Sequence, residues 1–167
     1  MWPYRSFAKA AIPILVDNRL GTRDTKTMRG MAAACETLAL GSISHHRPPF
    51  AIDSVKVGEQ DVAVHEESAW RTPFATLLHL KKDIDTWQPA VLIVAPMSGL
   101  FATLLRETAR TMLADHDVYI TDWHNARDVP LFAGPFGLDE YTEHIMDFTR
   151  QIGEGAHVVA ICQPCVA

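Results

Sequence analysis

The residues best suited to chemistry follow a short apolar stretch at residues 157–161, where Cys162 and Gln163 begin a turn. A cysteine thiolate is a strong nucleophile, and an adjacent base activates it. A nucleophile on a sharp turn between a strand and a helix needs small neighbours two places away, because backbone and helix crowd there. Ala160 meets this need, and Pro164 suits the first turn of a helix, which needs no N–H from it. Cys162 is therefore a candidate nucleophile, with a buried structural cysteine as the alternative.

A second loop that could take part in the same chemistry follows the continuous apolar run of residues 91–95. It reads Pro96-Met97-Ser98-Gly99 and precedes a helical pattern. Acyl transfer needs two N–H groups aimed at the oxyanion that forms on the carbonyl. We expect Met97 or Ser98 to supply one of them and Gln163, the residue after the nucleophile, to supply the other. The alternative role of Ser98 is to cap the helix, and the two roles are compatible.

The remaining reactive side chains do not form a recognisable site. The three cysteines, Cys35, Cys162 and Cys165, are too few for a disulfide framework. Cys162 and Cys165 have C-x-x-C spacing, but no second C-x-x-C or H-x-x-x-H follows to complete a zinc site. We expect no metal and no cofactor. Among the eight histidines, His79 and His124 fall at or near predicted strand ends, and we expect them to be rim or core residues.

The overall composition is that of one ordinary globular domain, with 48% hydrophobic and 21% charged residues. The formal net charge is −5 without a long basic run, which argues against nucleic acid as a partner. The apolar run of residues 10–16 follows Arg5 and Lys9 but has no clear cleavage site. No stretch approaches the roughly 20 apolar residues of a membrane span. We predict a cytoplasmic protein that does not cross a membrane, and we leave its oligomeric state open.

The elements that position these loops fall into two segments. Residues 1–49 form a helical and loop segment, with a helix at residues 27–40 that places Met31, Ala34, Cys35 and Leu38 on one face. From residue 50, alternating valines predict strands at 54–57 and 61–66, joined by a turn. A third strand is predicted at residues 75–81. The core of residues 50–167 therefore opens with antiparallel strands.

The pattern then changes to one strand after another with a helix between them. The run at residues 91–95 has the continuous apolar character of a strand buried on both faces. Another strand is predicted at 117–121 and a loop at 122–135. The predicted helices carry apolar faces of Phe101, Leu104, Leu105, Thr108 and Met112, and of Leu138, Tyr141, Ile145, Phe148 and Ile152. This order predicts an α/β fold in which hairpin strands lead into parallel β-α-β crossovers.

Long stretches of this core closely resemble intracellular polyhydroxybutyrate (polyhydroxyalkanoate) depolymerases. The similarity runs from about Phe50 to the end of the chain and is strongest over residues 91–164. It rests on residues 94–106, which begin Val-Ala-Pro-Met-Ser-Gly, on 116–123 with 125–131, and on 155–158 with 160–164. Residues 53–55 and 70–79 resemble the segment that precedes the core.

The resemblance implies an α/β-hydrolase that cleaves amorphous intracellular polyester through a Cys–Asp–His triad. It identifies Cys162 as the nucleophile and gives Cys165 no role. Leu100 stands where the family is expected to have a histidine. In the family the acid and the histidine lie well beyond the nucleophile. We therefore expect the chain to be an N-terminal part cut off just after the nucleophile elbow, inactive alone, with a polyester granule as its partner.

Three other functions are open at this point. A polyhydroxyalkanoate synthase-like acyltransferase also uses a cysteine at this turn, although Ala160 and Pro164 replace the glycines expected there. A non-catalytic granule-binding remnant and an unrelated thiol esterase are the others. The sequence does not determine which polymer side-chain length is preferred.

Overall fold

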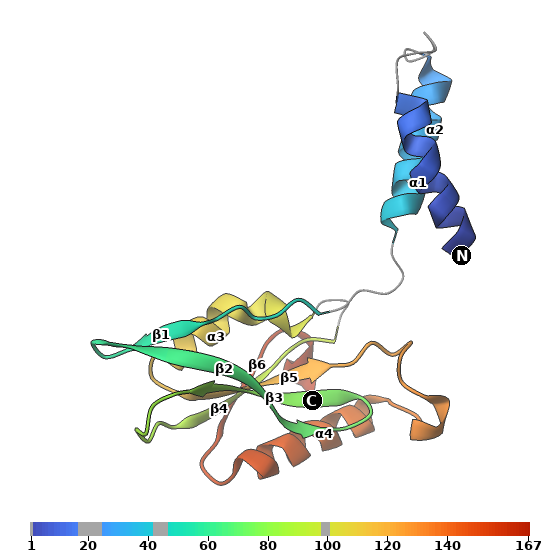
Figure 1. Ribbon diagram of the computed structural model, residues 1–167. Coiled ribbons are helices and arrows are strands. Elements are labelled where there is room, and N and C mark those ends of the chain that lie inside the picture. The colour runs from blue at the N-terminus through green and yellow to red at the C-terminus, as the bar shows by residue number, and fades with distance from the viewer. Residues whose placement is uncertain (1, 17–24, 42–46, 98–100) are drawn as a thin grey trace. The chain divides into compact units, whose positions relative to one another are not determined.

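The computed structural model describes residues 2–16, 25–41, 47–97 and 101–167, in two compact units, Met1–His45 and His46–Ala167. The first unit is a pair of antiparallel helices, α1 (Trp2–Val16) and α2 (Lys26–Leu40) (Figure 1). The Thr25 side chain caps α2 by accepting from the Met28 N–H at 3.3 Å. The helix predicted at residues 27–40 is confirmed, whereas α1 was not predicted.

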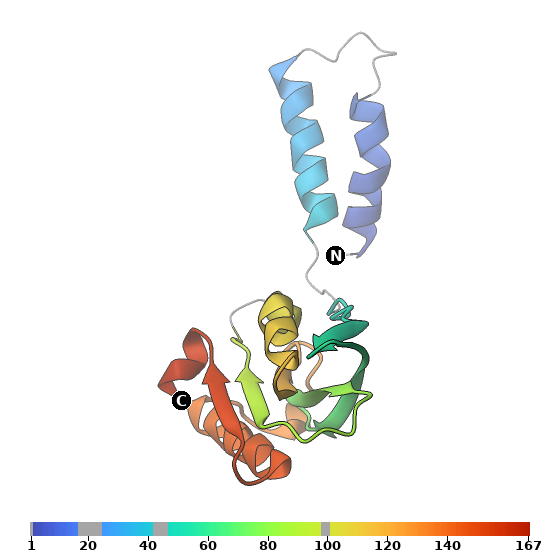
Figure 2. The same cartoon turned by 90° about the vertical axis from the view of Figure 1, so that its left-hand side faces the viewer.

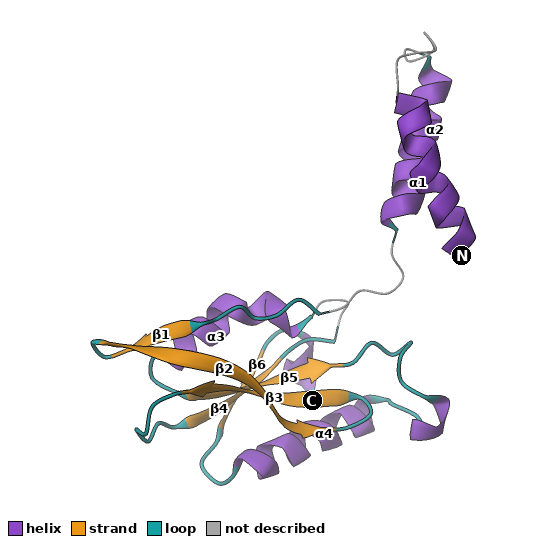
Figure 3. Cartoon of the chain, viewed as in Figure 1, coloured by secondary structure: helices purple, strands orange, loops and turns teal. Residues whose placement is uncertain are grey.

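The second unit is built on a six-stranded mixed sheet with the order β1-β2-β3-β5-β4-β6 (Figure 3). The first three strands, β1 (Ser54–Val57), β2 (Gln60–Arg71) and β3 (Ala75–Lys82), are antiparallel, and β3 is also antiparallel to β5 (Asp117–Trp123). Strands β5, β4 (Ala90–Val94) and β6 (His157–Ala160) are parallel. The predicted α/β class, with hairpin strands followed by parallel crossovers, is confirmed. Strands β2 and β5 run further than predicted.

The crossover helices cover opposite faces of the sheet (Figure 2). A short 3-10 turn, η2 (Ala102–Leu105), leads into α3 (Arg106–Leu113) between β4 and β5, and α4 (Leu138–Ile152) connects β5 to β6. Alternate residues of β4 point to the two cores: Val91 and Ile93 pack with the α3 side, Leu92 and Val94 with the α4 side. Because helices cover both faces of β4, its side chains are buried on both sides, which accounts for the unbroken apolar run at residues 91–95.

The predicted face of the first crossover helix was wrong in part, although Leu105 and Met112 do pack on the core. On η2 and α3 the buried residues are Ala102, Leu105, Ala109 and Leu113, while Leu104 is exposed. A 3-10 turn advances about 120° per residue rather than about 100°, so it rotates the face that follows. On α2 the predicted residues Met31 and Leu38 do share one side of the helix, but that side is exposed, and the buried residue is Ala39.

The α4 core gives a direct test of the fold. Phe148 is fully buried among the aromatic side chains beneath the sheet, and Leu138 on the same helix is exposed. We expect Phe148→Ala to lower the free energy of unfolding by about 3–5 kcal/mol, because it leaves a cavity in the core. Leu138→Ala should change it by less than about 0.5 kcal/mol. Urea denaturation measures both, and equal effects would contradict this placement of α4.

Candidate functional site

The carboxyl ends of the three parallel strands bring the two predicted loops to one edge of the sheet. Strand β4 pairs with β6 so that Val94 lies beside Ala160, two residues before Cys162. The chain leaves β4 toward α3 on one face and leaves β5 toward α4 on the other. Such a reversal between neighbouring strands is where open α/β sheets bind ligands. Met97 follows β4, one of these two strands, and Cys162 follows β6, which pairs with the other side of β4.

Cys162 occupies a sharp turn between β6 and the 3-10 turn η4 (Gln163–Val166). Its backbone is left-handed, with φ 66° and ψ −116°, a conformation that residues other than glycine rarely adopt. The Cys165 N–H donates to the Cys162 carbonyl at 3.1 Å and closes the turn, while Pro164 is buried in its first residues. Cys162 itself is exposed, so its thiol is open to a reactant.

The amides expected to bind an oxyanion are placed in part. Gln163 is the first residue of η4, so its N–H has no acceptor within that turn. Met97 is partly exposed at the end of the described part of the β4 loop. Ser98, together with Leu100, lies outside the described residues. The two-amide arrangement therefore stays a prediction, with Gln163 and Met97 at the same edge.

Two side chains of β5 fix the start of the β4 loop. The Ala95 N–H donates to Thr121 Oγ1 at 2.9 Å, and Trp123 Nε1 donates to the Ala95 carbonyl at 2.9 Å. Ala95 and Thr121 are both buried, so these bonds satisfy polar groups that water cannot reach. Sequence reasoning missed both anchors. The available signal was a buried threonine that follows the apolar residues Val118 and Ile120 in this strand.

An ion pair lies on the other face of β5. The Arg47 Nε is 2.8 Å from Asp122 Oδ2, and the same guanidinium bonds to Glu66 on β2. Burial raises the pKa of Asp122 above its ordinary value, although the neighbouring Arg47 opposes this. Arg47 also lies over the ring of Phe50, 5.4 Å from its centroid. The cluster ties the segment before β1 to the sheet close to the carboxyl edge.

The two singled-out histidines hold strands together. His124 uses both ring nitrogens: Nδ1 donates to the Pro73 carbonyl at 2.9 Å, so Nε2 accepts from Thr76 Oγ1 at 2.8 Å. His79 Nε2 donates to Asp117 Oδ1 at 2.7 Å, and its ring stacks on Tyr119. No histidine nitrogen in the described ranges bonds to the Cys162 sulfur.

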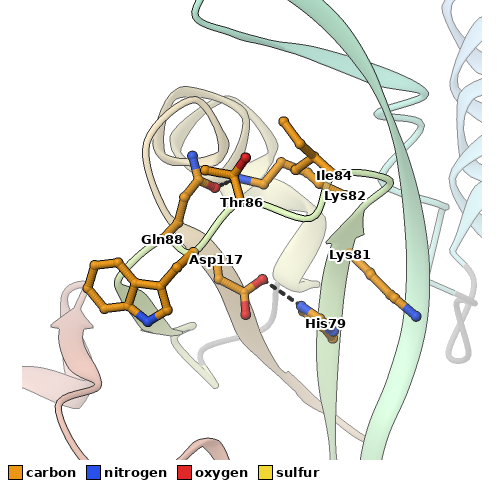
Figure 4. Close-up of a pocket in the computed structure, with 8 residues that line it drawn as sticks. His79, Lys81, Lys82, Ile84, Thr86, Gln88 and Asp117 are labelled. Carbon is orange, nitrogen blue, oxygen red and sulfur yellow. Dashed lines mark hydrogen bonds and ion pairs between the residues drawn. The ribbon is translucent and has the colours of Figure 1, made fainter.

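A polar cavity of about 270 Å³ lies at the opposite edge, where β4 and β5 begin. It is lined by His79, Lys81, Lys82, Ile84, Thr86, Trp87, Gln88 and Asp117 (Figure 4). The Lys82 ammonium is occupied, because it donates to the Leu113 and His116 carbonyls at the end of α3 and to Gln88. Burial lowers the pKa of Lys82. This cluster braces α3 against β3 and is separate from the Cys162 edge.

Comparisons of the chain with protein-family models, with curated proteins and with solved structures give no match. Within the described ranges, no three histidine, cysteine, aspartate or glutamate side chains come together as a metal site. No helix described is long and apolar enough to cross a membrane. The site is therefore defined by geometry alone: an exposed thiol on a left-handed turn, beside a loop that is anchored at its start.

The anchoring of Ala95 can be tested through stability. Thr121→Val keeps the shape of the side chain but removes the acceptor from a buried N–H, so we expect a loss of about 1–3 kcal/mol in the free energy of unfolding. Thr111→Val is the matched control, because the Thr111 hydroxyl bonds to the Glu107 carbonyl on the exposed side of α3. Chemical denaturation measures both variants. A neutral Thr121→Val would show that Ala95 does not need this bond.

The contacts of Asp117 with His79 and Tyr119 predict how the free energy of unfolding depends on pH. Burial acts to raise the pKa of Asp117, but hydrogen bonds from His79 and Tyr119 outweigh it and lower that pKa below 3.8. A carboxylate whose pKa is lower in the folded than in the unfolded protein stabilises the fold at pH values above its unfolded-state pKa. This stabilisation is lost as the pH falls through its folded-state pKa. Asp117→Asn should therefore lower the free energy of unfolding at neutral pH. The further decline of this free energy below about pH 4 should be smaller in the variant than in the parent chain. Asp85→Asn, at an exposed site, should leave the pH profile of denaturation unchanged.

Proposed function

We propose that this chain carries the nucleophile and the oxyanion-binding amides of an α/β-hydrolase that cleaves ester bonds in intracellular polyhydroxyalkanoate. The observation that carries the proposal is the backbone at Cys162. An exposed cysteine in a left-handed conformation, directly between a parallel strand and a helical turn, is what a nucleophile elbow requires.

The neighbouring loop supports the same chemistry. In α/β-hydrolases one oxyanion N–H comes from the residue after the nucleophile and the other from the loop between a neighbouring strand and its helix. Gln163 has the first position, and Met97 with Ser98 has the second. The hydrogen bonds that join Ala95 to Thr121 and Trp123 fix the start of this loop, and fixed amides favour oxyanion binding without reorganisation.

The reaction would run through an acyl-cysteine. The Cys162 thiolate attacks the ester carbonyl, and the two amides donate to the resulting oxyanion. Collapse of this intermediate expels the alkoxide, which takes up a proton, and water then releases the hydroxyacid from the thioester. The activating histidine and its acid, implied by the resemblance, are not among the described partners of Cys162.

A polymeric, apolar substrate is supported by the loop between β5 and α4. Leu131 is 99% exposed and Phe132 is 92% exposed in its 3-10 turn, η3 (Leu131–Ala133). This loop leaves the carboxyl end of β5, at the same edge as Cys162. Exposed apolar side chains on a loop from this edge suit the methylene and methyl groups of a polyester chain.

The proposed function is tested by acylation with p-nitrophenyl butyrate. We expect one equivalent of p-nitrophenolate and one butyryl group on the 167-residue chain, because Cys162 has no histidine partner among the described residues to drive turnover. Cys162→Ala should remove the label. Cys165→Ala is the matched control and should retain it, since the Cys165 thiol instead donates to the Ala160 carbonyl at 3.3 Å. Intact-mass analysis and peptide mapping locate the acyl group.

Two outcomes would contradict this reading. Labelling that persists in Cys162→Ala would remove Cys162 from the mechanism. Sustained, Cys162-dependent release of hydroxybutyrate from amorphous polymer would show that a histidine of this chain does act as the base.

A further inference from the structure

The two-helix unit carries large apolar side chains on its outside. On α1, Tyr4, Phe7 and Ile14 are 71%, 74% and 67% exposed, and their spacing places them along one side of the helix, here called the α1 stripe. On α2, Met31 and Leu38 are seven residues apart and half-exposed, and they form the α2 stripe. Large apolar side chains exposed along helices of 15 residues indicate a surface that binds a partner or a membrane.

Both stripes face the same side of the helix pair. Each helix contacts the other near a buried alanine, Ala8 on α1 and Ala39 on α2, and Arg5 of α1 donates to the Ala39 carbonyl at 3.2 Å. At 3.6 residues per turn, each stripe lies about 90° from its alanine, in the same rotational sense. Because the helices are antiparallel, equal rotations in one sense point to a common side (Figure 1). The two stripes therefore form one apolar face.

Basic side chains occupy the other side of the pair. Lys9 and Arg29 lie about 90° from the same alanines in the opposite sense, and both are exposed. Over Met1–His45 there are six Lys or Arg residues against three Asp or Glu residues, a net charge of +3. Over His46–Ala167 there are nine against seventeen, a net charge of −8. The positive charge of the chain is thus concentrated in its two-helix unit.

We propose that α1 and α2 dock flat on an anionic lipid surface, with the apolar face placed among the headgroups. Helices that bind in this way combine an apolar side with Lys and Arg on the polar side, and their charge is attracted by anionic lipids. The acidic second unit is repelled by the same surface, so the helix pair is the part that makes contact. Docking does not depend on ester hydrolysis by Cys162.

The test uses the whole 167-residue chain and vesicles of equal parts phosphatidylcholine and phosphatidylglycerol, with binding measured by co-sedimentation. We expect Phe7→Glu and Met31→Glu each to weaken binding about tenfold, because each places a charge in the apolar face. Leu138→Glu is the matched control, since it makes a similar change at a 61% exposed site in the second unit, and it should bind like the parent chain. Vesicles of phosphatidylcholine alone should bind about tenfold more weakly than the anionic ones.

A second variant separates docking from folding. Lys9→Glu alters only the polar side, so it should keep the helical circular dichroism and weaken binding to the anionic vesicles alone. The proposal is overturned if the parent chain does not bind anionic vesicles, or if Phe7→Glu binds as the parent does. It is also overturned if Phe7→Glu instead dissociates a dimer in size-exclusion chromatography, which would identify a second copy as the occupant of the apolar face.

Discussion

The exclusion of water from both faces of β4 is the constraint on which the second unit depends. Every backbone N–H and carbonyl of a strand in that position must pair with a neighbouring strand, and β5 and β6 provide the pairs on either side. Its side chains must then fill two separate cores, one under α3 and one under α4. Polar loops emerge only where the strands end, which is why Ala95 and the turn at Cys162 follow paired residues of β4 and β6 at one edge.

The two ends of the sheet have different characters. Where β4 and β5 begin, charged groups are saturated by fixed partners: Lys82 by the carbonyls of α3, and Asp117 by His79 and Tyr119. Where the parallel strands finish, the exposed Cys162 follows β6 and the exposed apolar side chains of η3 follow β5. The clusters of Lys82 and Asp117 thus lie at the opposite end of the sheet from the turn at Cys162.

Much of the second unit could be predicted from the sequence, because its signals are local. The apolar run at β4, the alternating valines of β1 and β2 and the turn at Cys162 each depend on a few adjacent residues. What could not be predicted depends on partners distant in sequence. Thr121 and Trp123 act as anchors only because β5 lies beside β4. The helix α1 was missed for a different reason: its apolar residues occur on all sides of the helix, and Pro13 obscures the helical period. The ester chemistry itself stays a prediction.

The alternation of side chains along β5 limits how this region can change in length. Thr121 and Trp123 reach Ala95 from one face, while Asp122 between them meets Arg47 on the other. Inserting or deleting a single residue in β5 would exchange the two faces, burying the carboxylate among aromatic rings and turning both anchors away from Ala95. Insertions should instead be tolerated a few residues later, in the exposed stretch around Arg127 and Asp128, where no alternation has to be kept. Variation in length among related chains is thus expected to collect in that loop and to spare the strand that precedes it.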